Sequence, residues 1–589
     1  MLPLPYEDSR RLTGINVYFA EPCALLETRV DARIDDAFVR LWQERVEFAS
    51  AILNWPPATT VVRRQSLGNG FAIIAPVDQL FVATEVNEWA FLHAYSAGDA
   101  TKIDGLFHAP AFPLIGDDDL ALHTLRLAAT AERRSDLSAL IAAAHQHDLP
   151  VLLDDDDLTI GEGTGARTWP IQALPAVDSL PWHALHAIPV ALISGSNGKT
   201  TTTRLVASMC EAHGRRTAYS CTDGVFVGGE AIASGDYSGP AGARAALRDP
   251  RAEAAVLETA RGGILRRGLA LERVQAAIVT NISADHFGEH GVGNLDELAD
   301  TKLVVARALV ADGVLVLNAD DTALLGRAHR VPARIAWFAV DADHAKLRAQ
   351  RAATATCGAR DGEMILHRDG RDHSLGRVEN MPLTMHGTAT YNIANIAGAS
   401  LVANALGVPV ETIARVLAHF GGDHADNPGR LMRWLFGTTS VLVDYAHNPD
   451  GLRGLLAVAR AATPGGKIAL VLGQAGNRED ADIRELAATA ATFSPALVVL
   501  KDIESHLRGR ASGEVAAILR DELLRNGVSA ERIVTCLDEV GAASTALTWA
   551  RAADTVVLPI HDRKARDLVV TMLDRLAAAH WRPGQPFSV

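Results

Sequence analysis

The sequence predicts an α/β protein built from three domains, and three observations support this prediction. Its 589 residues exceed one ordinary domain at roughly 150 residues each. Short apolar runs typical of buried strands alternate along the chain with segments of helical periodicity. A glycine-rich turn after one of these strands leads directly into a helical segment. We expect a mixed α/β domain over 1–181, a central α/β domain over 182–425 that carries this turn, and a third α/β domain over 426–589.

The composition is that of an ordinary globular protein, with 48% hydrophobic and 21% charged residues. The formal net charge of -14 argues against nucleic acid and anionic membranes as main partners. The five cysteines show no CxxC spacing, which favours reduced thiols. No apolar run approaches the roughly 18 residues of a membrane span, and the first residues lack an apolar signal core. We therefore expect a cytoplasmic protein that contacts neither membranes nor nucleic acid.

The first 181 residues contain no catalytic motif, and substrate binding is the role we expect for them. Their apolar runs predict strands at 16–19, 24–30, 71–74, 80–84 and 150–153. Helical spacing predicts helices at 35–51, 120–131 and 137–147. Residues 161–181 are rich in Gly, Pro and Ala, so we expect them to link this domain to the next.

The stretch that organises the chain is Gly195–Thr201, which reads Gly-Ser-Asn-Gly-Lys-Thr-Thr between an apolar strand at 188–193 and a helical run at 202–213. Glycines allow backbone N–H groups to surround an anion, and the helix N-terminus adds partial positive charge. Lys199 is placed to reach the β- and γ-phosphates of a nucleotide, and a threonine hydroxyl to bind Mg²⁺. The spacing is shorter than the common G-x-x-x-x-G-K-T form, but the order of strand, turn and helix favours phosphate binding over a chance turn.

Two further strands of the central region end in side chains that bind metals. The strand at 254–258 ends in Glu258, and the strand at 276–282 is followed by His286. Because ligands of open α/β sheets bind at the carboxyl ends of the strands, we expect both side chains near the phosphate-binding turn. A carboxylate and an imidazole there can hold a divalent ion. Since Mg²⁺ usually takes oxygen ligands, a hydrogen-bonding role for His286 remains the alternative.

A family resemblance is carried by the segments 195–201, 222–224, 257–266 and 280–286, of which the third reads Leu-Glu-Thr-Ala-Arg-Gly-Gly-Ile-Leu-Arg. They resemble the Mur ligase superfamily, which includes the folylpolyglutamate synthases, and above all the Mur-ligase-like module of the cyanophycin synthetases. The resemblance extends over about 188–562 and implies a central P-loop ATPase domain followed by a Rossmann-like domain. It implies that ATP phosphorylates a carboxylate and that an amine then attacks the acyl phosphate to give an amide.

The resemblance also assigns roles to residues of the central domain. Lys199 would hold the transferred phosphate, Thr200 one Mg²⁺, and Glu258 with His286 a second Mg²⁺. Lys302 lies where several Mur ligases carry a carbamylated lysine, and an ordinary solvated helix lysine is the alternative. The implied nucleotide-binding residues are Gly195, Asn197, Gly198, Lys199, Thr200, Thr201, Asn318, Asn392, Asn395, Arg430 and Asp444. The family has His where this chain has Tyr391.

The third domain contains the string Asp444–Pro449, reading Asp-Tyr-Ala-His-Asn-Pro, which also resembles the family. By this resemblance Asp444 holds the ribose hydroxyls, while His447 and Asn448 approach the phosphates or the acyl intermediate. The implied catalytic residues are Lys199, Glu258, His286, Lys302 and His447. The segment 507–514 offers two arginines that can clamp a carboxylate, a solvated loop being the alternative. The residues assigned to substrate are Asp223, Arg261, Asn448, Arg508 and Arg510.

These residues predict an ATP-dependent amide ligase that uses ATP and two Mg²⁺ ions. Its substrates are expected to be an amino acid and a peptide or amino-acid polymer that supplies the carboxylate. The sequence shows no ATP-grasp module of the kind found in cyanophycin synthetases, so a separate ATP-grasp ligase is a candidate partner. A folylpolyglutamate-synthase-like or muramyl-peptide ligase, a non-catalytic ATP-binding subunit, and assembly into a homo-oligomer stay open.

Overall fold

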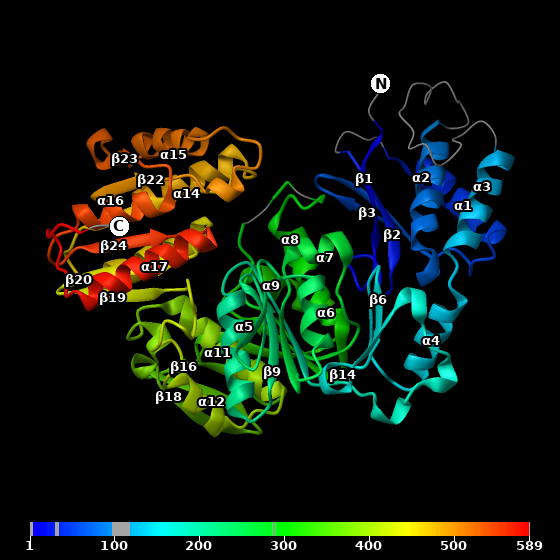
Figure 1. Ribbon diagram of the computed structural model, residues 1–589, viewed down its shortest axis with the longest axis horizontal. Helices are drawn as coiled ribbons and strands as arrows, with labels where there is room; N and C mark the ends of the chain where they lie inside the picture. Colours follow the sequence, from blue (N-terminus) through cyan, green and yellow to red (C-terminus); the bar gives the residue numbers. More distant parts are fainter. Residues whose placement is uncertain (1–3, 30–33, 97–117, 285–286, 289, 588–589) are drawn as a thin grey trace.

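The computed structural model of the chain describes residues 4–29, 34–96, 118–284, 287–288 and 290–587. It confirms the α/β class, since helices pack on both antiparallel and parallel sheets. Figure 1 shows the N-terminal elements and the C-terminal elements at opposite ends of the molecule, with the largest sheet between them. Within the described residues, the sheets fall inside the expected domain ranges 1–181, 182–425 and 426–589.

The first domain begins with a four-stranded antiparallel sheet in the order β1-β2-β4-β3, covered by helices. Its strands are β1 (Tyr6–Leu12), β2 (Cys23–Thr28), β3 (Thr60–Gln65) and β4 (Gly68–Ile74), and its helices are α1 (Asp36–Ile52), α2 (Leu80–Ser96) and α3 (Asp118–Glu132). Trp42 and Phe91 pack edge-on against Phe71, with ring centroids 4.9 and 5.2 Å away. These aromatic contacts fix the helices on one face of the sheet.

A second small sheet follows, in the order β5-β6-β7, and it corrects the expected linker. Its elements are α4 (Ser135–Gln146), β5 (Val151–Leu153), β6 (Asp157–Ile160) and β7 (Arg167–Pro170). Leu174 and Val177 pack with Trp169 into a core of their own. Gly163 lies so close to the central domain that a Cβ there would be 2.1 Å from the Ala252 carbonyl oxygen. The expectation of a loose linker over 161–181 is therefore wrong.

Two other expectations for this domain are wrong for identifiable reasons. Residues 16–19 form a turn because the Asn16 carboxamide accepts hydrogen bonds from the backbone N–H groups of Tyr18 and Phe19, both at 2.9 Å. Residues 80–84 begin helix α2, which is buried on nearly every side. A helix that is apolar all round has no helical periodicity to read, so its first turns resemble a strand.

The central domain is built on an eleven-stranded sheet in the order β11-β10-β9-β12-β8-β13-β14-β15-β16-β17-β18. The strands from β9 to β16 in this order run parallel, and antiparallel hairpins extend both edges. The strands are β8 (Val190–Ser194), β9 (Thr217–Cys221), β10 (Gly224–Val227), β11 (Glu230–Ser234), β12 (Ala254–Glu258), β13 (Val274–Val279), β14 (Leu309–Asn318), β15 (Arg334–Asp341), β16 (Thr356–Arg360), β17 (Glu363–Arg368) and β18 (Arg371–Arg377).

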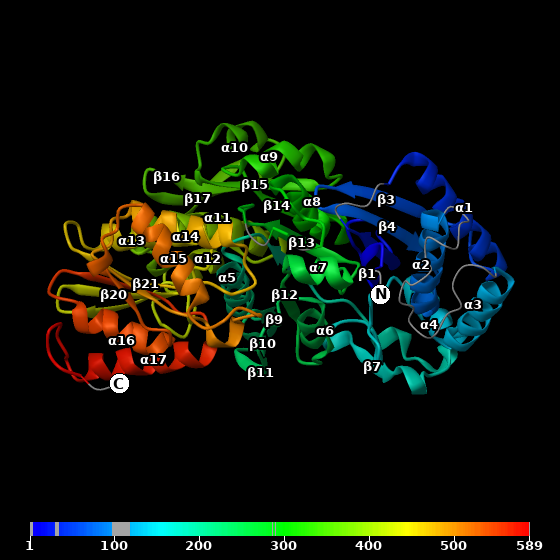
Figure 2. The same ribbon diagram turned by 90° about the horizontal axis from the view of Figure 1, so that it is seen from above.

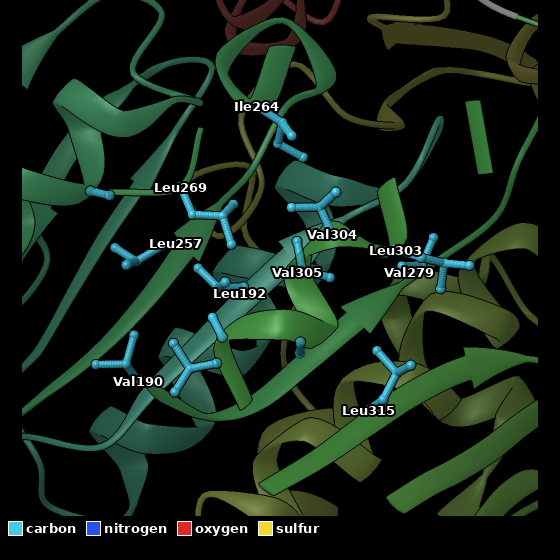
Figure 3. Packing of buried hydrophobic residues seen from close by; sticks show 14 of the residues in the cluster. Val190, Leu192, Leu257, Ile264, Leu269, Val279, Leu303, Val304, Val305 and Leu315 are labelled. Atoms are coloured by element: carbon cyan, nitrogen blue, oxygen red, sulfur yellow. The ribbon is translucent and has the colours of Figure 1, made fainter. Parts of the chain in front are cut away.

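Helices cover both faces of this sheet (Figure 2), which explains why its strands read as continuous apolar runs. Val190 and Leu192 of β8 point into one core, shown in Figure 3, while Ala191 and Ile193 point into the other. Helices α6 to α10 line the first core, and α5, α11 and α12 line the second. The helices are α5 (Lys199–Ala212), α6 (Pro240–Arg248), α7 (Arg261–Arg267), α8 (Leu295–Lys302), α9 (Thr322–Arg327), α10 (Ala345–Gln350), α11 (Thr390–Ala405) and α12 (Val410–Leu417).

The third domain has a six-stranded sheet in the order β19-β20-β24-β21-β22-β23, parallel except for the edge strand β19. Its strands are β19 (Met432–Phe436), β20 (Thr439–Asp444), β21 (Ile468–Leu472), β22 (Leu497–Leu500), β23 (Ile533–Thr535) and β24 (Thr555–Pro559). Its helices are α13 (Pro449–Ala462), α14 (Asp480–Thr492), α15 (Glu514–Arg525), α16 (Glu539–Trp549) and α17 (Arg563–Ala578).

Among the described residues, the structure contains no helix of the length and apolarity needed to span a membrane.

Candidate nucleotide-binding site

A cavity of about 910 Å³ lies between the central and third domains. Its walls come from the turn after β8, from helix α7, and from the loops that follow β13, β20, β21 and β24. These loops follow the carboxyl ends of parallel strands, where open α/β sheets bind ligands. The cavity is therefore the candidate site, with one wall from each of the two domains.

The glycine-rich turn has the backbone conformation that its sequence predicts. Gly195 and Gly198 have φ angles of 140° and 83°, which favour glycine. A Cβ at position 198 would lie 2.2 Å from the Asn395 carboxamide oxygen, so helix α11 closes directly on the turn. Helix α5 begins at Lys199, and the Lys199 ammonium donates to the Ser196 carbonyl oxygen at 3.0 Å. Backbone N–H groups at the start of a helix can bind an anion, so the anion cradle stays a prediction for this turn.

Next to the turn, hydroxyl groups surround the buried carboxylate of Glu258 at the end of β12. The Thr200 hydroxyl donates to one Glu258 oxygen at 2.8 Å, and the Thr222 hydroxyl donates to the other at 3.1 Å. The Arg430 guanidinium, from the hinge to the third domain, reaches the Thr200 hydroxyl at 3.3 Å. A set of carboxylate and hydroxyl oxygens suits Mg²⁺. His286, the other expected ligand, lies outside the described residues.

Lys302 lies beneath the same turn and is only 5% exposed, which disagrees with a solvated helix lysine. Its ammonium donates to the Gly195 carbonyl oxygen at 2.8 Å. Asn197 is held from three sides: Asn281 accepts from its backbone N–H, Thr280 donates to its carbonyl, and Asn448 donates to its side-chain oxygen at 2.9 Å. The turn is thus fixed by the loop after β13 and by the third domain.

Three more of the asparagines predicted to contact the nucleotide line the cavity with Asn197. Asn395 donates to Asn392 at 3.0 Å, and Asn392 donates to the Leu383 carbonyl at 2.9 Å. Asn318 donates to the Thr280 carbonyl at 3.0 Å. Beside them the Tyr391 hydroxyl is buried without a hydrogen-bond partner among the described residues. Burial and the nearby Asp444 carboxylate raise the pKa of Tyr391, so its hydroxyl stays a donor.

The third domain contributes the string Asp444–Pro449. The two Asp444 oxygens accept from the backbone N–H groups of Leu431 and Ala446, each at 2.7 Å. Burial raises the pKa of Asp444, and the Arg430 guanidinium opposes this shift. The Arg430 guanidinium also stacks over the Tyr445 ring at 4.2 Å. Asp444 and His447 line the cavity, whereas Asn448 lies behind the wall and binds the glycine-rich turn.

The structure separates the expected substrate residues. Arg261 and Arg508 line the cavity. Arg510 does not, since its guanidinium is bound by Asp480 and Glu514, both at 2.8 Å. Asp223 also lies outside the cavity, between Arg204 at 2.7 Å and Arg566 at 2.6 Å. Asp223 therefore joins the central and third domains, and its predicted contact with substrate has no support in this placement.

Sequence reasoning missed several residues of the site. Arg266 and Arg267 of helix α7 line the cavity, and the dense arginines of segment 257–266 were the available signal. His561 also lines the cavity and contacts the buried Lys501, which is 0% exposed. A lysine that ends an apolar strand was the signal there, but its partners come from distant segments.

Fold and site together define a class: an α/β protein in which a glycine-rich strand–turn–helix loop faces the carboxyl edge of a second parallel sheet. Models of the Mur ligase middle domain and of the Mur ligase glutamate ligase domain match residues 193–403 and 429–559. The chain belongs to the Mur ligase superfamily, as the resemblance of its motifs predicts.

Several individual proteins are similar to this chain. Cyanophycin synthetase of Trichormus variabilis is 38% identical over 373 residues, which are 63% of this chain and 41% of that protein. UDP-N-acetylmuramoyl-L-alanyl-D-glutamate--2,6-diaminopimelate ligase of Chlorobaculum tepidum is 28% identical over 57% of this chain and 68% of that protein. Folylpolyglutamate synthase of Mycobacterium tuberculosis, solved with ADP, is 18% identical, with a TM-score of 0.49, over 66% of this chain and 90% of that one. The chain spans less than half the length of the cyanophycin synthetases it matches.

Proposed function

We propose that this protein is an ATP-dependent carbon–nitrogen ligase, which joins an amino acid to a carboxylate and forms ADP and phosphate. The observation that carries the proposal is a cluster of hydroxyl and carboxylate groups that lines a cavity between two domains. The cluster consists of Thr200, Thr222 and Glu258, and Lys199 lines the same cavity. The similarity to cyanophycin synthetases and to Mur ligases over this same region supports it.

The residues present fit a nucleotide with Mg²⁺. The donor atoms at Thr200, Thr222 and Glu258 are all oxygens, and the backbone N–H groups at the start of helix α5 suit an anion. When bound, ATP and Mg²⁺ supply an activated phosphoryl group and neutralise its charge. We propose two ions, the second held by Glu258 together with His286.

The proposed reaction has two steps. In the first, an oxygen of the substrate carboxylate bonds to the terminal phosphorus as the bond to ADP breaks, which gives an acyl phosphate. In the second, an amine bonds to the acyl carbon, phosphate leaves, and the amine loses a proton. Lys199 and Arg430 are the cations placed to offset the charge of the phosphates. His447 lines the third-domain wall of the cavity and is the candidate we propose to accept the proton.

We propose a cyanophycin-synthetase-like choice of substrates, with a peptide or amino-acid polymer as the source of the carboxylate and a basic amino acid as the amine. Arg261, Arg266, Arg267 and Arg508 line the cavity, and forked guanidinium groups suit carboxylates. We propose a separate ATP-grasp ligase as the partner for any other ligation step.

The test is release of phosphate from ATP with Mg²⁺, screened over amino acids with and without aspartate-containing peptides, with product masses measured in parallel. We expect release only when a peptide and Arg or Lys are both present, with a product heavier by one amino-acid residue. Release with folate and glutamate, or with a UDP-muramyl peptide, would assign a different ligase. If none of these substrates stimulates phosphate release and the protein only binds ATP, the result would assign a non-catalytic subunit.

A further inference from the structure

A buried ionic network lies behind the third-domain wall of the cavity. Lys501 follows strand β22 and is 0% exposed, and its ammonium forms an ion pair with Glu539 at the start of helix α16. A Cβ at Gly473 would lie 2.8 Å from Lys501 Cγ, so the glycine after β21 leaves room for the lysine. A buried charge is costly unless it is paired and hydrogen-bonded, so the partners of this lysine show what the network is built around.

The third member of the network is His561, which follows β24. Its Nδ1 lies 3.0 Å from the Lys501 ammonium, and its Nε2 lies 3.1 Å from the Ala446 carbonyl oxygen. An ammonium only donates and a carbonyl only accepts. The two partners therefore assign one tautomer, with a bare Nδ1 and a proton on Nε2. Burial and the charge of Lys501 lower the pKa of His561, which keeps the ring neutral.

Glu539 completes the support of this histidine. One of its oxygens accepts from the His561 backbone N–H at 2.9 Å, and the other accepts from the Asp562 backbone N–H at 2.8 Å. The backbone and both ring nitrogens of His561 are thus bound by protein groups. The histidine lines the cavity but has no free nitrogen for a substrate, which excludes a role in proton transfer.

Ala446 belongs to the loop 444–449, which is the part of this wall that faces the glycine-rich turn. The same loop is held by Asp444, which accepts from the Ala446 N–H at 2.7 Å, and by Gln474, which donates to the His447 carbonyl at 2.8 Å. From this loop Asn448 reaches Asn197 at 2.9 Å. The carbonyl of Ala446 is the point at which the buried network holds the loop.

We propose that His561 is a positioning residue, which uses its Nε2–H to hold the Ala446 carbonyl and so fixes the loop that presents His447 to the cavity and binds the glycine-rich turn through Asn448. The effect on catalysis rests on the proposed function, whereas the effect on the order of the loop does not. Lys501 and Glu539 serve to hold the histidine in the one tautomer that can make this bond.

Two substitutions of His561 separate its hydrogen bond to Ala446 from its contact with Lys501. In His561→Gln the amide nitrogen lies near the position of Nε2 and can still donate to Ala446. In His561→Asn the amide oxygen lies near the position of Nδ1, so Lys501 keeps an acceptor but the side chain is too short for Ala446. We would measure hydrogen exchange of the peptide 444–452, together with kcat and the KM for ATP.

We expect His561→Asn to speed exchange of this peptide about 10-fold, the equivalent of one lost hydrogen bond. Its kcat should fall about 10- to 100-fold, as for a misplaced catalytic group, while the KM for ATP changes less than about threefold. His561→Gln should stay within about threefold of the wild type in each quantity. Wild-type behaviour of the Asn variant, or loss in Gln and rescue in Asn, would overturn the proposal.

Leu519→Ala is the matched control, because Leu519 is 0% exposed in the core of the same domain, on helix α15, which packs against α14 and β22. It should lower the urea midpoint without changing exchange of 444–452. If the His561 variants do not fold, the wild-type protein still decides: nitrogen NMR of labelled histidines should show a neutral ring protonated at Nε2. Protonation at Nδ1 would overturn the proposal, whatever reaction the protein catalyses.

Discussion

The two walls of the cavity line the same site, but their residues are arranged differently along the chain. The central wall starts from seven consecutive residues, Gly195–Thr201, which form the turn and the start of one helix. The wall of the third domain is assembled from Asp444, Gln474 and His561, which end or follow three different strands, with Lys501 behind them. The turn of the first wall has a local geometry that distant loops then fix, whereas the second wall exists only when its whole sheet has formed.

This difference determines what a mutation can do at each wall. On the central wall a single side chain contributes its own charge, so its loss should change the rate of the reaction but not the stability of the fold. On the wall of the third domain each group is held by others, so loss should spread through the network. Between the walls lies Asp223, buried with Arg204 of α5 and Arg566 of α17.

The largest expected effect comes from breaking the joint between the walls, which is formed by Asp223, Arg204 and Arg566. Asp223→Asn removes the charge that pairs with Arg204 and Arg566, which are 6% and 4% exposed, and leaves both guanidinium groups buried. Loss of one partner of a buried pair costs about 3–5 kcal/mol. Urea unfolding followed by tryptophan fluorescence should show this loss. Asp36→Asn, which removes an exposed partner of Arg64, is the control and should cost less than about 1 kcal/mol.

The next largest effect is expected from loss of the Lys199 charge on the central wall. Lys199→Ala should lower kcat about 10²- to 10³-fold, since one charge that stabilises the phosphoryl transfer is lost. The urea midpoint should not change, because the Lys199 ammonium binds only the Ser196 carbonyl among the described residues. Lys467→Ala, at an exposed position before β21, is the control. Full turnover in the Lys199 variant would refute the phosphate-binding role of the turn.

Loss of the Glu258 carboxylate, on the same wall, should have a somewhat smaller effect on kcat. Glu258→Gln keeps the shape, can accept from one of the Thr200 and Thr222 hydroxyls and donate to the other, but removes the charge that attracts Mg²⁺. We expect kcat to fall about 100-fold and the Mg²⁺ concentration for half-maximal rate to rise. Glu253→Gln, at the exposed residue before the same strand, should change neither. An unchanged Mg²⁺ requirement would remove Glu258 from the metal site.

The same comparison explains how much the sequence could predict. The order strand–turn–helix placed Gly195, Lys199 and Thr200, because all of the geometry is local. The wall of the third domain was only half predicted: Asp444 and His447 lie in one family string, but nothing links Lys501 to His561 along the chain. Asp223 was misjudged for the same reason, since its partner Arg566 is 343 residues away. Long-range ion pairs carry no periodicity and no spacing that a single sequence shows.

The joint between the walls should also respond to pH. Its arginines lower the pKa of Asp223 to about 2 from an ordinary 3.8. The folded state thus favours the charged form, and the contribution of Asp223 is complete above about pH 4 and lost as the pH falls towards 2. The difference in unfolding free energy between the wild type and Asp223→Asn should shrink by about 2 kcal/mol over that range. A constant difference would mean that the carboxylate is not held by these arginines.

The smallest expected effect sharpens the comparison at the point where the walls meet. The Tyr391 hydroxyl on helix α11 is buried without a partner among the described residues, near Asp444 of the opposite wall. An unmade hydrogen bond of a buried hydroxyl costs about 1–3 kcal/mol, so Tyr391→Phe should leave the free protein as stable as the wild type or more so. If the nucleotide supplies the missing acceptor, the same variant should raise the KM for ATP about fivefold and reduce stabilisation by ATP. Thermal unfolding without and with ATP measures both the stability of the free protein and its stabilisation by ATP. If ATP stabilises the variant and the wild type equally, the Tyr391 hydroxyl does not bind the nucleotide.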